Sequence, residues 1–527
     1  MAGNDSGPAH WADINAARII REKGEKDVYT CASGITPSGT VHIGNFREII
    51  SVDLVVRALR RLGKNARFVY SWDDYDVFRK VPKNMPGQEM LARHLRRPIT
   101  LVPDPWGGEE SYARRHELEV ERELHRVGIA PEYLYQARRY RESLYAEQIK
   151  QALSKTAEIR AILDAHRTEA LPGDWFPVSV FCGGCDRDTT TVLSWDGDYG
   201  VEYRCDSCGR HESVDLRSSP LVKLPWRVDW PMRWAYEGVD FEPAGKDHHS
   251  EGGSFDTAKE VVRRVFGCAP PVSFQYDFIR IKGRGGKISS SSGEVIDLKD
   301  VLEVYTPEIA RYLFAGTRPN TEFAISFDLD VIKIYEDYDR TERIYFGAEA
   351  ASEKKREKEK RVYELSQVAG VPSVMPYQVP FRHLCSLLQI NSGDVGKTLD
   401  ALPGLGAGQR QGLIPRAECA WRWITGFAPE DFRFSLRGAD DKPVAVCDAS
   451  RAVIRELREI IGARFAALDE KSLGEAVYAA CGNAGLEPKA FFPEMYRALV
   501  GKDKGPRLAA FILSVGRERI LDILKAY

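Results

Sequence analysis

Four cysteines near the middle of the chain have the spacing of a metal site. Cys182 and Cys185 form one Cys-x2-Cys pair, Cys205 and Cys208 form a second, and 19 residues separate the pairs. Each pair predicts a tight turn that presents two thiolates, and four thiolates match the tetrahedral coordination of Zn²⁺. A redox dithiol explains the pattern less well, because there are two pairs. Four thiolates leave no open coordination position, so this zinc would stabilise the fold and not catalyse.

Residues 27–50 (DVYTCASGITPSGTVHIGNFREII) predict a phosphate site. The apolar run at 28–32 indicates a buried strand, the glycines and proline at 33–39 a tight turn, and the apolar spacing from Ile43 a helix. His42 and Asn45 stand at the helix start, where free backbone N–H groups and partial positive charge favour phosphate. A histidine that merely caps the helix is the structural alternative.

Two acidic segments also follow predicted strands. Residues 72–76 (WDDYD) lie at the carboxyl end of a strand, where open α/β sheets bind ligands, although a solvated loop would explain them too. In residues 241–249 (FEPAGKDHH), Gly245 permits close backbone approach and Asp247 can accept hydrogen bonds from both ribose hydroxyls. A loop in which Asp247 only caps the next helix is the alternative.

Strands and helices of an α/β fold must position these clusters. Residues 81–220 interrupt the strand–helix alternation with a proline-rich stretch, charged helices at 109–166 and the cysteine pairs. After about residue 300 the pattern is almost entirely helical. Further strands are predicted at 66–71, 221–224, 226–231, 273–276 and 278–281, with a hairpin at 189–194 and 199–203.

The composition is that of an ordinary soluble protein with several domains. The 527 residues are 43% hydrophobic and 29% charged, and the net charge of −2 neither supports nor excludes a nucleic-acid partner. The N-terminus lacks the apolar run of a signal peptide, and no stretch approaches the ~18 apolar residues of a membrane span. Ten cysteines, four of them in Cys-x2-Cys pairs, indicate a reducing compartment, so we expect a cytoplasmic protein.

Residues 42–45 (HIGN) resemble the HIGH signature of class I aminoacyl-tRNA synthetases. The preceding residues 33–39 (SGITPSG) make the chain similar to the class I lysyl-tRNA synthetases in particular. Residues 287–293 (KISSSSG) resemble the KMSKS loop, which holds pyrophosphate in the transition state. Ser290 stands at the second lysine of KMSKS, and Ser292 replaces a lysine that many relatives have. The resemblance covers nearly the whole chain.

The resemblance implies an ATP site made from three of these segments. His42 and Asn45 would contact the phosphates, and Gly245 and Asp247 the ribose. Lys287 would supply the cation for the leaving pyrophosphate, so the implied catalytic residues are His42, Asn45 and Lys287. Mg²⁺ is expected with the ATP, although the sequence contains no dedicated cage for it. The implied ATP-binding residues are His42, Asn45, Gly245, Asp247, Lys287, Ser289 and Ser290.

The resemblance also implies a lysine site. Glu48 and Tyr276 would bind the ε-ammonium, and Trp226 would form a wall. An unpaired buried glutamate is costly, which makes a cationic ligand its natural partner, whereas a surface glutamate is the alternative. Gly34 and Thr36 would contact the α-amino end, and His248 would lie on the amino-acid side of the pocket. The implied lysine-binding residues are Gly34, Thr36, Glu48, Trp226, His248 and Tyr276.

The implied fold class is α/β, with a Rossmann-type class I catalytic domain, a zinc-ribbon insertion and an all-α anticodon-binding domain. A second metal cluster of Asp, Cys and His occurs in related archaeal-type enzymes. Here Asp104 is followed by Gly108 and Glu109 where Cys and His would be expected, so we predict one zinc only. The expected domains are 1–80 (lead and first catalytic half), 81–220 (insertion, ribbon about 176–216), 221–300 (second catalytic half), 301–355 (stem-contact helices) and 356–527 (anticodon binding).

The implied activity is the ATP-dependent activation of L-lysine to lysyl-adenylate. The lysyl group would then pass to the 2′-hydroxyl of the 3′-terminal adenosine of tRNA(Lys). The expected partners are tRNA(Lys), lysine and ATP, with no membrane, and we expect a monomer. A class I synthetase for arginine, glutamate or cysteine is the nearer alternative. A zinc-ribbon RNA-binding protein whose nucleotide fold has lost catalysis is the farther one.

Overall fold

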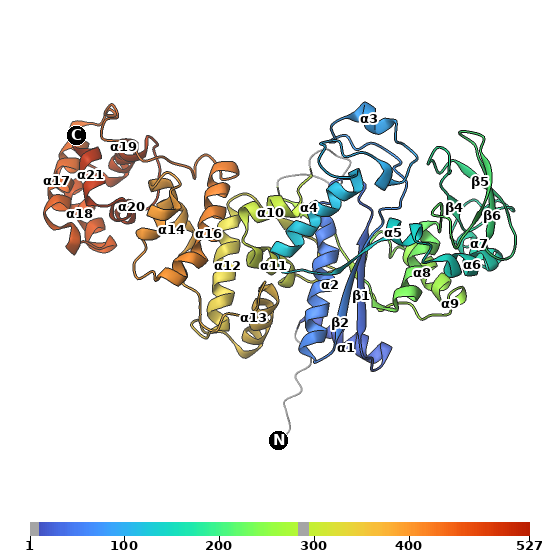
Figure 1. The fold of residues 1–527 in the computed structure, drawn as a ribbon. Helices are drawn as coiled ribbons and strands as arrows, with labels where there is room; N and C mark the ends of the chain where they lie inside the picture. Colours follow the sequence, from blue (N-terminus) through green and yellow to red (C-terminus); the bar gives the residue numbers. More distant parts are fainter. Residues whose placement is uncertain (1–9, 283–294) are drawn as a thin grey trace, which may run out of the picture. The chain divides into compact units, whose positions relative to one another are not determined.

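The computed structural model describes residues 10–282 and 295–527 (Figure 1). The described chain forms two compact units. Unit 1 consists of Met1–Val301, Ala310–Ile325 and Ala350–Val371, and unit 2 consists of Leu302–Ile309, Ser326–Glu349 and Pro372–Tyr527. Because the segments alternate along the chain, no single cut separates the two units.

A parallel sheet forms the centre of unit 1. Its order is β3-β2-β1-β9, built from β1 (Tyr29–Ile35), β2 (Ala66–Trp72), β3 (Glu132–Tyr135) and β9 (Val239–Phe241). Parallel pairing continues beyond β9, where β10 (Ala244–Gly245) pairs with β11 (Gln275–Tyr276). The strand order reverses between β1 and β9, and open α/β sheets bind ligands at the carboxyl ends of strands at such a point. The predicted parallel α/β core is confirmed.

Helix α2 (Ile43–Arg61) follows β1 directly. Its residues Ile43, Phe46 and Ile50 recur at helical spacing and are at most 2% exposed. Arg47 lies on the buried side as well and donates to the carbonyls of Phe278, Arg318 and Thr321. The helix that begins at the expected phosphate site is therefore fixed along its length by the apolar core and by one buried guanidinium.

Two expectations for unit 1 are wrong. Residues 226–231, predicted as a strand, begin helix α8 (Trp226–Glu237), in which three tryptophans at four-residue spacing share one face. Residues 109–166, predicted as helices, include β3, which pairs with Val69–Trp72 of β2. Tyr133 and Tyr135 alternate with other residues after Pro131, which is the strand signal that the surrounding charge obscured.

The remaining elements of unit 1 surround the sheet and form the cysteine-containing insertion. The antiparallel strands β5 (Thr190–Trp195), β6 (Gly200–Cys205) and β7 (His211–Asp215) form the ribbon, and β4 (Ser179–Val180) pairs with β8 (Val222–Lys223) at its base. Strands β12 (Ile279–Ile281) and β13 (Phe323–Ile325) pair in parallel. The helices are α1 (Trp11–Lys23), α3 (Gln88–Ala92), α4 (Tyr112–Arg126), α5 (Gln136–Arg141), α6 (Ala146–Ser154), α7 (Thr156–Asp164), α9 (Ser254–Arg264) and α13 (Glu353–Ser366).

Helix α13 belongs to unit 1, although the sequence division placed most of it in the last domain. Arg361 on α13 forms two hydrogen bonds, at 2.7 and 2.8 Å, with the carboxylate of Asp13 on α1. The carbonyl of Leu365 accepts from Arg311, which also pairs with Asp53 of α2 at 2.6 Å. The Arg361–Asp13 ion pair and the Arg311–Leu365 hydrogen bond attach the helix to the nucleotide-fold half of the chain.

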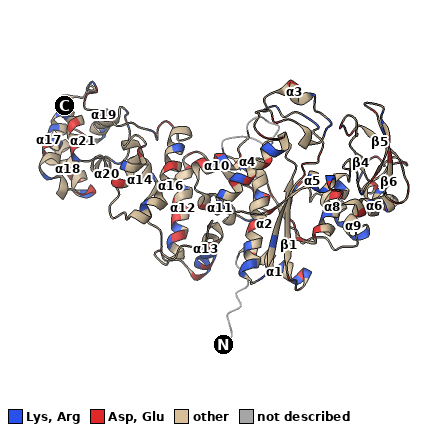
Figure 2. Ribbon diagram, in the orientation of Figure 1, with Lys and Arg blue, Asp and Glu red and all other residues tan. Residues whose placement is uncertain are grey.

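Unit 2 is helical, as predicted for the C-terminal region. Tyr335 stacks on Phe381 with ring centroids 3.8 Å apart, and Arg416 pairs with Asp339 at 2.6 Å. Figure 2 shows both signs of charge along α12 and α4, in keeping with the net charge of −2. The helices are α12 (Asp330–Tyr345), α14 (Phe381–Ile390), α15 (Val395–Asp400), α16 (Ala407–Gly426), α17 (Asp448–Arg464), α18 (Glu470–Asn483), α19 (Pro488–Val500), α20 (Leu508–Val515) and α21 (Arg517–Leu524).

Two short helices, α10 (Leu298–Val304) and α11 (Pro307–Ala315), contain boundaries between the units. Pro307 begins the second of these helices, where its missing N–H costs no hydrogen bond. Within residues 10–282 and 295–527, no helix is long and apolar enough to span a membrane.

Candidate active site

The turn between β1 and α2 places His42 and Asn45 at the carboxyl edge of the sheet. His42 is the N-cap of α2, and Asn45 lies in its first turn. A Cβ atom on Gly44 would lie 2.8 Å from the His42 ring, so glycine is needed for this imidazole position. Among the first backbone N–H groups of α2, those of Ile43 and Asn45 already donate to the carbonyls of Ile296 and His42. The positive end of the helix dipole still favours an anion next to the histidine.

The basic loop with Lys287, Ser289 and Ser290 lies outside the described residues. The segments on either side of it are described. The backbone N–H of Lys282 donates to the carbonyl of Ile325 at 2.9 Å, and that of Ile43 donates to the carbonyl of Ile296 at 2.8 Å. Asp297 forms an antiparallel bridge with His42. The chain that leaves the loop thus lies beside the start of α2.

Glu48 lies one turn further along α2 and has three hydrogen-bond donors. The Ser33 hydroxyl and the Gly34 backbone N–H donate to Oε1 at 2.7 and 3.3 Å, and the Tyr276 hydroxyl donates to Oε2 at 2.5 Å. Burial raises the pKa of Glu48, and the hydrogen bonds from Tyr276, Ser33 and Gly34 lower it only in part. The structure therefore brings Gly34, Glu48 and Tyr276 together around one partly buried carboxylate that has only neutral donors.

Strand pairing brings Gly245 and Asp247 to the same place. Gly245 pairs with Tyr276 in the β10–β11 register. A Cβ atom on Gly245 would lie 2.7 Å from the Asp247 carboxylate and 3.5 Å from the Tyr276 ring. The two residues expected at the ribose thus adjoin the tyrosine that donates to Glu48.

Helix α8 supplies an aromatic wall. The rings of Trp226 and Trp230 stack 5.1 Å apart with an interplanar angle of 15°, and His248 lies 5.5 Å from Trp226. The His248 Nδ1 atom forms a hydrogen bond of 2.8 Å with the Ser254 hydroxyl. The structure therefore brings the expected Trp226 and His248 together, and adds Trp230.

Sequence reasoning missed Glu242. Its two carboxylate oxygens accept hydrogen bonds from the indole N–H groups of Trp230 and Trp234, at 3.1 and 2.5 Å. Burial, followed by the negative charge of Glu48, raises the pKa of Glu242 to about 7. Its signals in the sequence were its place in the segment 241–249 and its position directly after a strand, at the ligand-binding edge of the sheet.

The acidic segment after β2 is buried and paired, not a solvated loop. Asp73 pairs with Arg233 of α8 at 2.6 Å, and Asp74 accepts from the Ala137 backbone N–H at 2.7 Å. Asp76 accepts from the Thr36 hydroxyl at 2.8 Å. The last of these contacts connects the segment to the expected amino-acid site.

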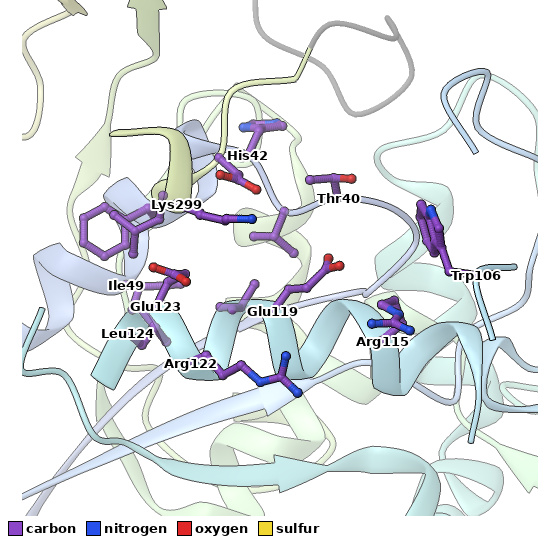
Figure 3. A pocket seen from close by; sticks show the side chains of 15 residues that line it. Thr40, His42, Ile49, Trp106, Arg115, Glu119, Arg122, Glu123, Leu124 and Lys299 are labelled. Atoms are coloured by element: carbon purple, nitrogen blue, oxygen red, sulfur yellow. The ribbon is translucent and has the colours of Figure 1, made fainter. Parts of the chain in front are cut away.

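A cavity of about 420 Å³ adjoins His42 on the side of α4 (Figure 3). Figure 3 shows Glu119 and Arg122 projecting from α4, with Thr40 and His42 on the opposite side. Lys299, which follows the basic loop in the chain, also lines the cavity. Acidic and basic groups thus surround a space next to the phosphate-site histidine.

The four cysteines of the ribbon converge. Their Sγ atoms all lie within 4.8 Å of one another, and the Cys182–Cys208 and Cys185–Cys205 pairs are 3.5 and 3.6 Å apart. Zn–S bonds of about 2.3 Å in a tetrahedron require sulfurs about 3.8 Å apart. The side chains therefore fit a zinc ion without rearrangement of the fold.

Asp104, where a second metal cluster would begin, has other partners. Arg115 donates to Asp104 Oδ2 through Nε and a terminal nitrogen, at 3.1 and 2.6 Å. The backbone N–H groups of Trp106 and Glu109 also donate to this carboxylate, both at 3.1 Å. A guanidinium thus already neutralises the acid, and the single zinc stays a prediction.

Comparison with known proteins gives the family. The family described as "tRNA synthetases class I (K)" matches residues 9–369. A lysine–tRNA ligase of Borreliella burgdorferi is 55% identical over 519 residues, which cover 98% of this chain and 99% of that protein. Lysine–tRNA ligases of Treponema pallidum and Thermococcus kodakarensis are 53% and 42% identical over 98% of this chain and 98% and 99% of their own lengths. The chain belongs to the class I tRNA synthetases of the lysine (K) family.

Proposed function

We propose that this enzyme is a lysine–tRNA ligase. It joins lysine and ATP to form lysyl-adenylate and pyrophosphate. It then transfers the lysyl group to the 2′-hydroxyl of the terminal adenosine of tRNA(Lys). The observation that supports the choice of lysine is the partly buried Glu48 carboxylate, because its three donors are neutral and leave its negative charge uncompensated.

The amino acid lies between Glu48 and the turn after β1. Its ε-ammonium binds Glu48 and Tyr276, and its aliphatic chain packs against Trp226. Thr36 and Gly34 bind the α-amino end, and His248 borders the same pocket. A long apolar stem with a terminal cation matches a site that has aromatic walls and one buried anion.

ATP lies at the start of α2. His42, Asn45 and the helix N-terminus bind its phosphates, and Gly245 and Asp247 bind its ribose. Lys287, Ser289 and Ser290 of the basic loop complete the site, with Mg²⁺ on the phosphates. The lysine carboxylate attacks the α-phosphate itself, so the protein acts by positioning and by stabilising charge.

The other assignments concern the parts outside the catalytic site. Zinc at Cys182, Cys185, Cys205 and Cys208 stabilises the insertion. The C-terminal helices of unit 2 bind the anticodon, and the protein acts as a cytoplasmic monomer. None of these parts supplies a reacting group.

An exchange assay tests the proposal. The enzyme is incubated with labelled pyrophosphate, ATP and each of the twenty amino acids in turn. Lysine alone should support exchange, and charging of tRNA with lysine should follow. Exchange with arginine, glutamate or cysteine would instead favour another class I specificity, and no exchange with any amino acid would favour an RNA-binding protein without catalysis.

A further inference from the structure

The Thr36 hydroxyl has a fixed hydrogen-bond direction. Its Oγ1 atom donates to Asp76 Oδ2 at 2.8 Å. The other oxygen of Asp76 accepts from the ammonium of Lys223 at 2.6 Å, and Lys223 also donates to the carbonyl of Tyr75 at 3.1 Å. Side chains from β8, from the end of β2 and from the turn after β1 thus form a chain of hydrogen bonds that ends at Thr36.

The Asp76 end of this chain carries a negative charge. Burial favours the neutral carboxyl, but the Lys223 ammonium and the hydrogen bonds from Lys223 and Thr36 lower the pKa of Asp76 below its ordinary value. Burial lowers the pKa of Lys223, yet Asp76 and then Asp229 raise it by more, so its ammonium stays charged. The Lys223 side chain is 9% exposed and that of Asp76 is 26% exposed.

An ionised Asp76 determines what Thr36 can offer to a ligand. A hydroxyl has one proton and two lone pairs. Since the carboxylate can only accept, the threonine proton points to Asp76 and the lone pairs remain for the ligand. An ammonium group has donors only, whereas a hydroxyl or amide could both donate and accept. Thr36 is therefore an acceptor matched to an ammonium.

We propose that Asp76 and Lys223 are positioning residues of the amino-acid site, which make Thr36 the acceptor that selects the α-ammonium of the substrate. The inference rests on the proposed function, because that function assigns Thr36 to the α-amino end. Asp76 fixes the direction of the hydroxyl, and Lys223 fixes Asp76. Recognition of the α-ammonium by Thr36 is thus separate from recognition of the ε-ammonium by Glu48.

The fold explains why this pair is far apart in sequence. Asp76 follows β2, whereas Lys223 lies on β8, which leaves the cysteine ribbon. Lys223 pairs with Ser179 of β4 at the base of that ribbon. The strand that follows the insertion therefore supplies the cation that orients a hydroxyl at the catalytic sheet.

The test uses two lysine analogues as competitive inhibitors of lysine-dependent pyrophosphate exchange. 6-Aminohexanoate lacks the α-amino group, and norleucine lacks the ε-amino group. In Asp76→Asn, the side-chain amide can donate to Thr36 and consume one of its lone pairs. We expect the KM for lysine and the inhibition constant of norleucine to rise about tenfold, with that of 6-aminohexanoate within about threefold of wild type. The KM for ATP should not change.

Three further variants separate positioning from general damage. Lys223→Met should raise the KM for lysine in the same way, and Lys223→Arg should restore most of the loss because it keeps the charge. Asp27→Asn, an exposed substitution of the same kind, should have no effect. Asp76→Asn should add nothing in a Thr36→Val background, since both substitutions remove the same acceptor.

The outcomes distinguish the two proposals. If Thr36→Val leaves the KM for lysine unchanged, the assignment of Thr36 fails and the inference fails with it. If Thr36→Val raises that KM but Asp76→Asn does not, only the inference is overturned. Additive effects in the double variant would also overturn it, because Asp76 would then act independently of the threonine.

Discussion

Two partly buried carboxylates at the catalytic sheet have opposite surroundings. Asp76 has the ammonium of Lys223 at 2.6 Å, and its pKa lies below the ordinary value. Glu48 has the hydroxyls of Ser33 and Tyr276 and one backbone N–H, and burial raises its pKa. The protein itself supplies the cation at the first site and leaves the second without one. A carboxylate of the second kind indicates a cationic ligand, whereas one of the first kind indicates a structural or positioning role.

Removal of the cysteine site should have the largest effect. It should act on the site of Asp76 and Lys223, which binds the α-ammonium of the substrate. A structural zinc contributes on the order of 10 kcal/mol in small peptides, so Cys182→Ser should unfold the ribbon. Because Lys223 lies at the base of this ribbon, we expect a higher KM for lysine even where α2 stays folded. Limited proteolysis and elemental analysis measure the two consequences, with one zinc expected per wild-type chain.

Cys268→Ser, at an exposed cysteine outside the cluster, is the matched control. It should retain the zinc and the protease resistance of wild type. A wild-type protein that contains no zinc would contradict the structural assignment, and two zinc ions per chain would contradict the prediction of a single site.

Glu48→Gln should act on the other end of the substrate, its ε-ammonium. Loss of a charge-assisted partner costs about 1.5–3 kcal/mol, which corresponds to a KM for lysine about 10- to 150-fold higher. The KM for ATP should change little, and norleucine should inhibit the variant as well as it inhibits wild type. Exchange kinetics with lysine and norleucine measure both effects. A change in the KM for lysine of less than about threefold would exclude Glu48 as the ammonium ligand, and Glu25→Gln at the surface is the control.

The sequence was sufficient for the strand–turn–helix that contains His42, because local spacing and glycines determine that unit. The cysteine ribbon could be predicted for the same reason. Strand β3 was missed, because the alternation of Tyr133 and Tyr135 is a weak strand signal in a charged region, and pairing with β2 completes the strand. Helix α8 was missed because Trp226, Val228 and Trp230 alternate with polar residues, which fits a strand as well as a helix. Trp234, beyond the predicted strand, extends the four-residue spacing of Trp226 and Trp230 by another turn.

Site residues that act through partners distant in sequence were the least predictable. Glu48 and Tyr276 were proposed from a family resemblance, and their contact links positions 228 residues apart. Asp76 and Lys223 are 147 residues apart, and only Asp76 lies in a segment, WDDYD, that the sequence singled out. Such pairs follow from the order of strands in the sheet, which local sequence patterns do not encode.

Glu242→Gln should have a smaller effect, because this residue acts on the aromatic wall and not on the ammonium. A glutamine offers one acceptor oxygen to two indole N–H groups, so one hydrogen bond of about 1 kcal/mol is lost and the KM for lysine rises roughly fivefold. Since the pKa of Glu242 is about 7, wild-type Glu242 becomes neutral in acid. The ratio of variant to wild-type KM should therefore be larger near about pH 8 than near about pH 6. A ratio that does not change with pH would show that the charge of Glu242 does not matter.

The smallest expected effect is the release of less than one proton, on average, for each lysine that binds. Burial raises the pKa of Glu48 in the free enzyme, so a part of the population carries a proton there at mildly acidic pH. A bound ammonium favours the ionised carboxylate and lowers that pKa, so lysine binding must expel this proton, and lysine affinity must fall as the pH falls. Calorimetric titration with lysine in buffers of different ionisation enthalpy measures the release. Glu48→Gln should abolish the release, whereas Asp76→Asn should preserve it, because Asp76 is already ionised beside Lys223. Equal release from Glu48→Gln and wild type would mean that Glu48 is not the group that exchanges its proton for the substrate cation.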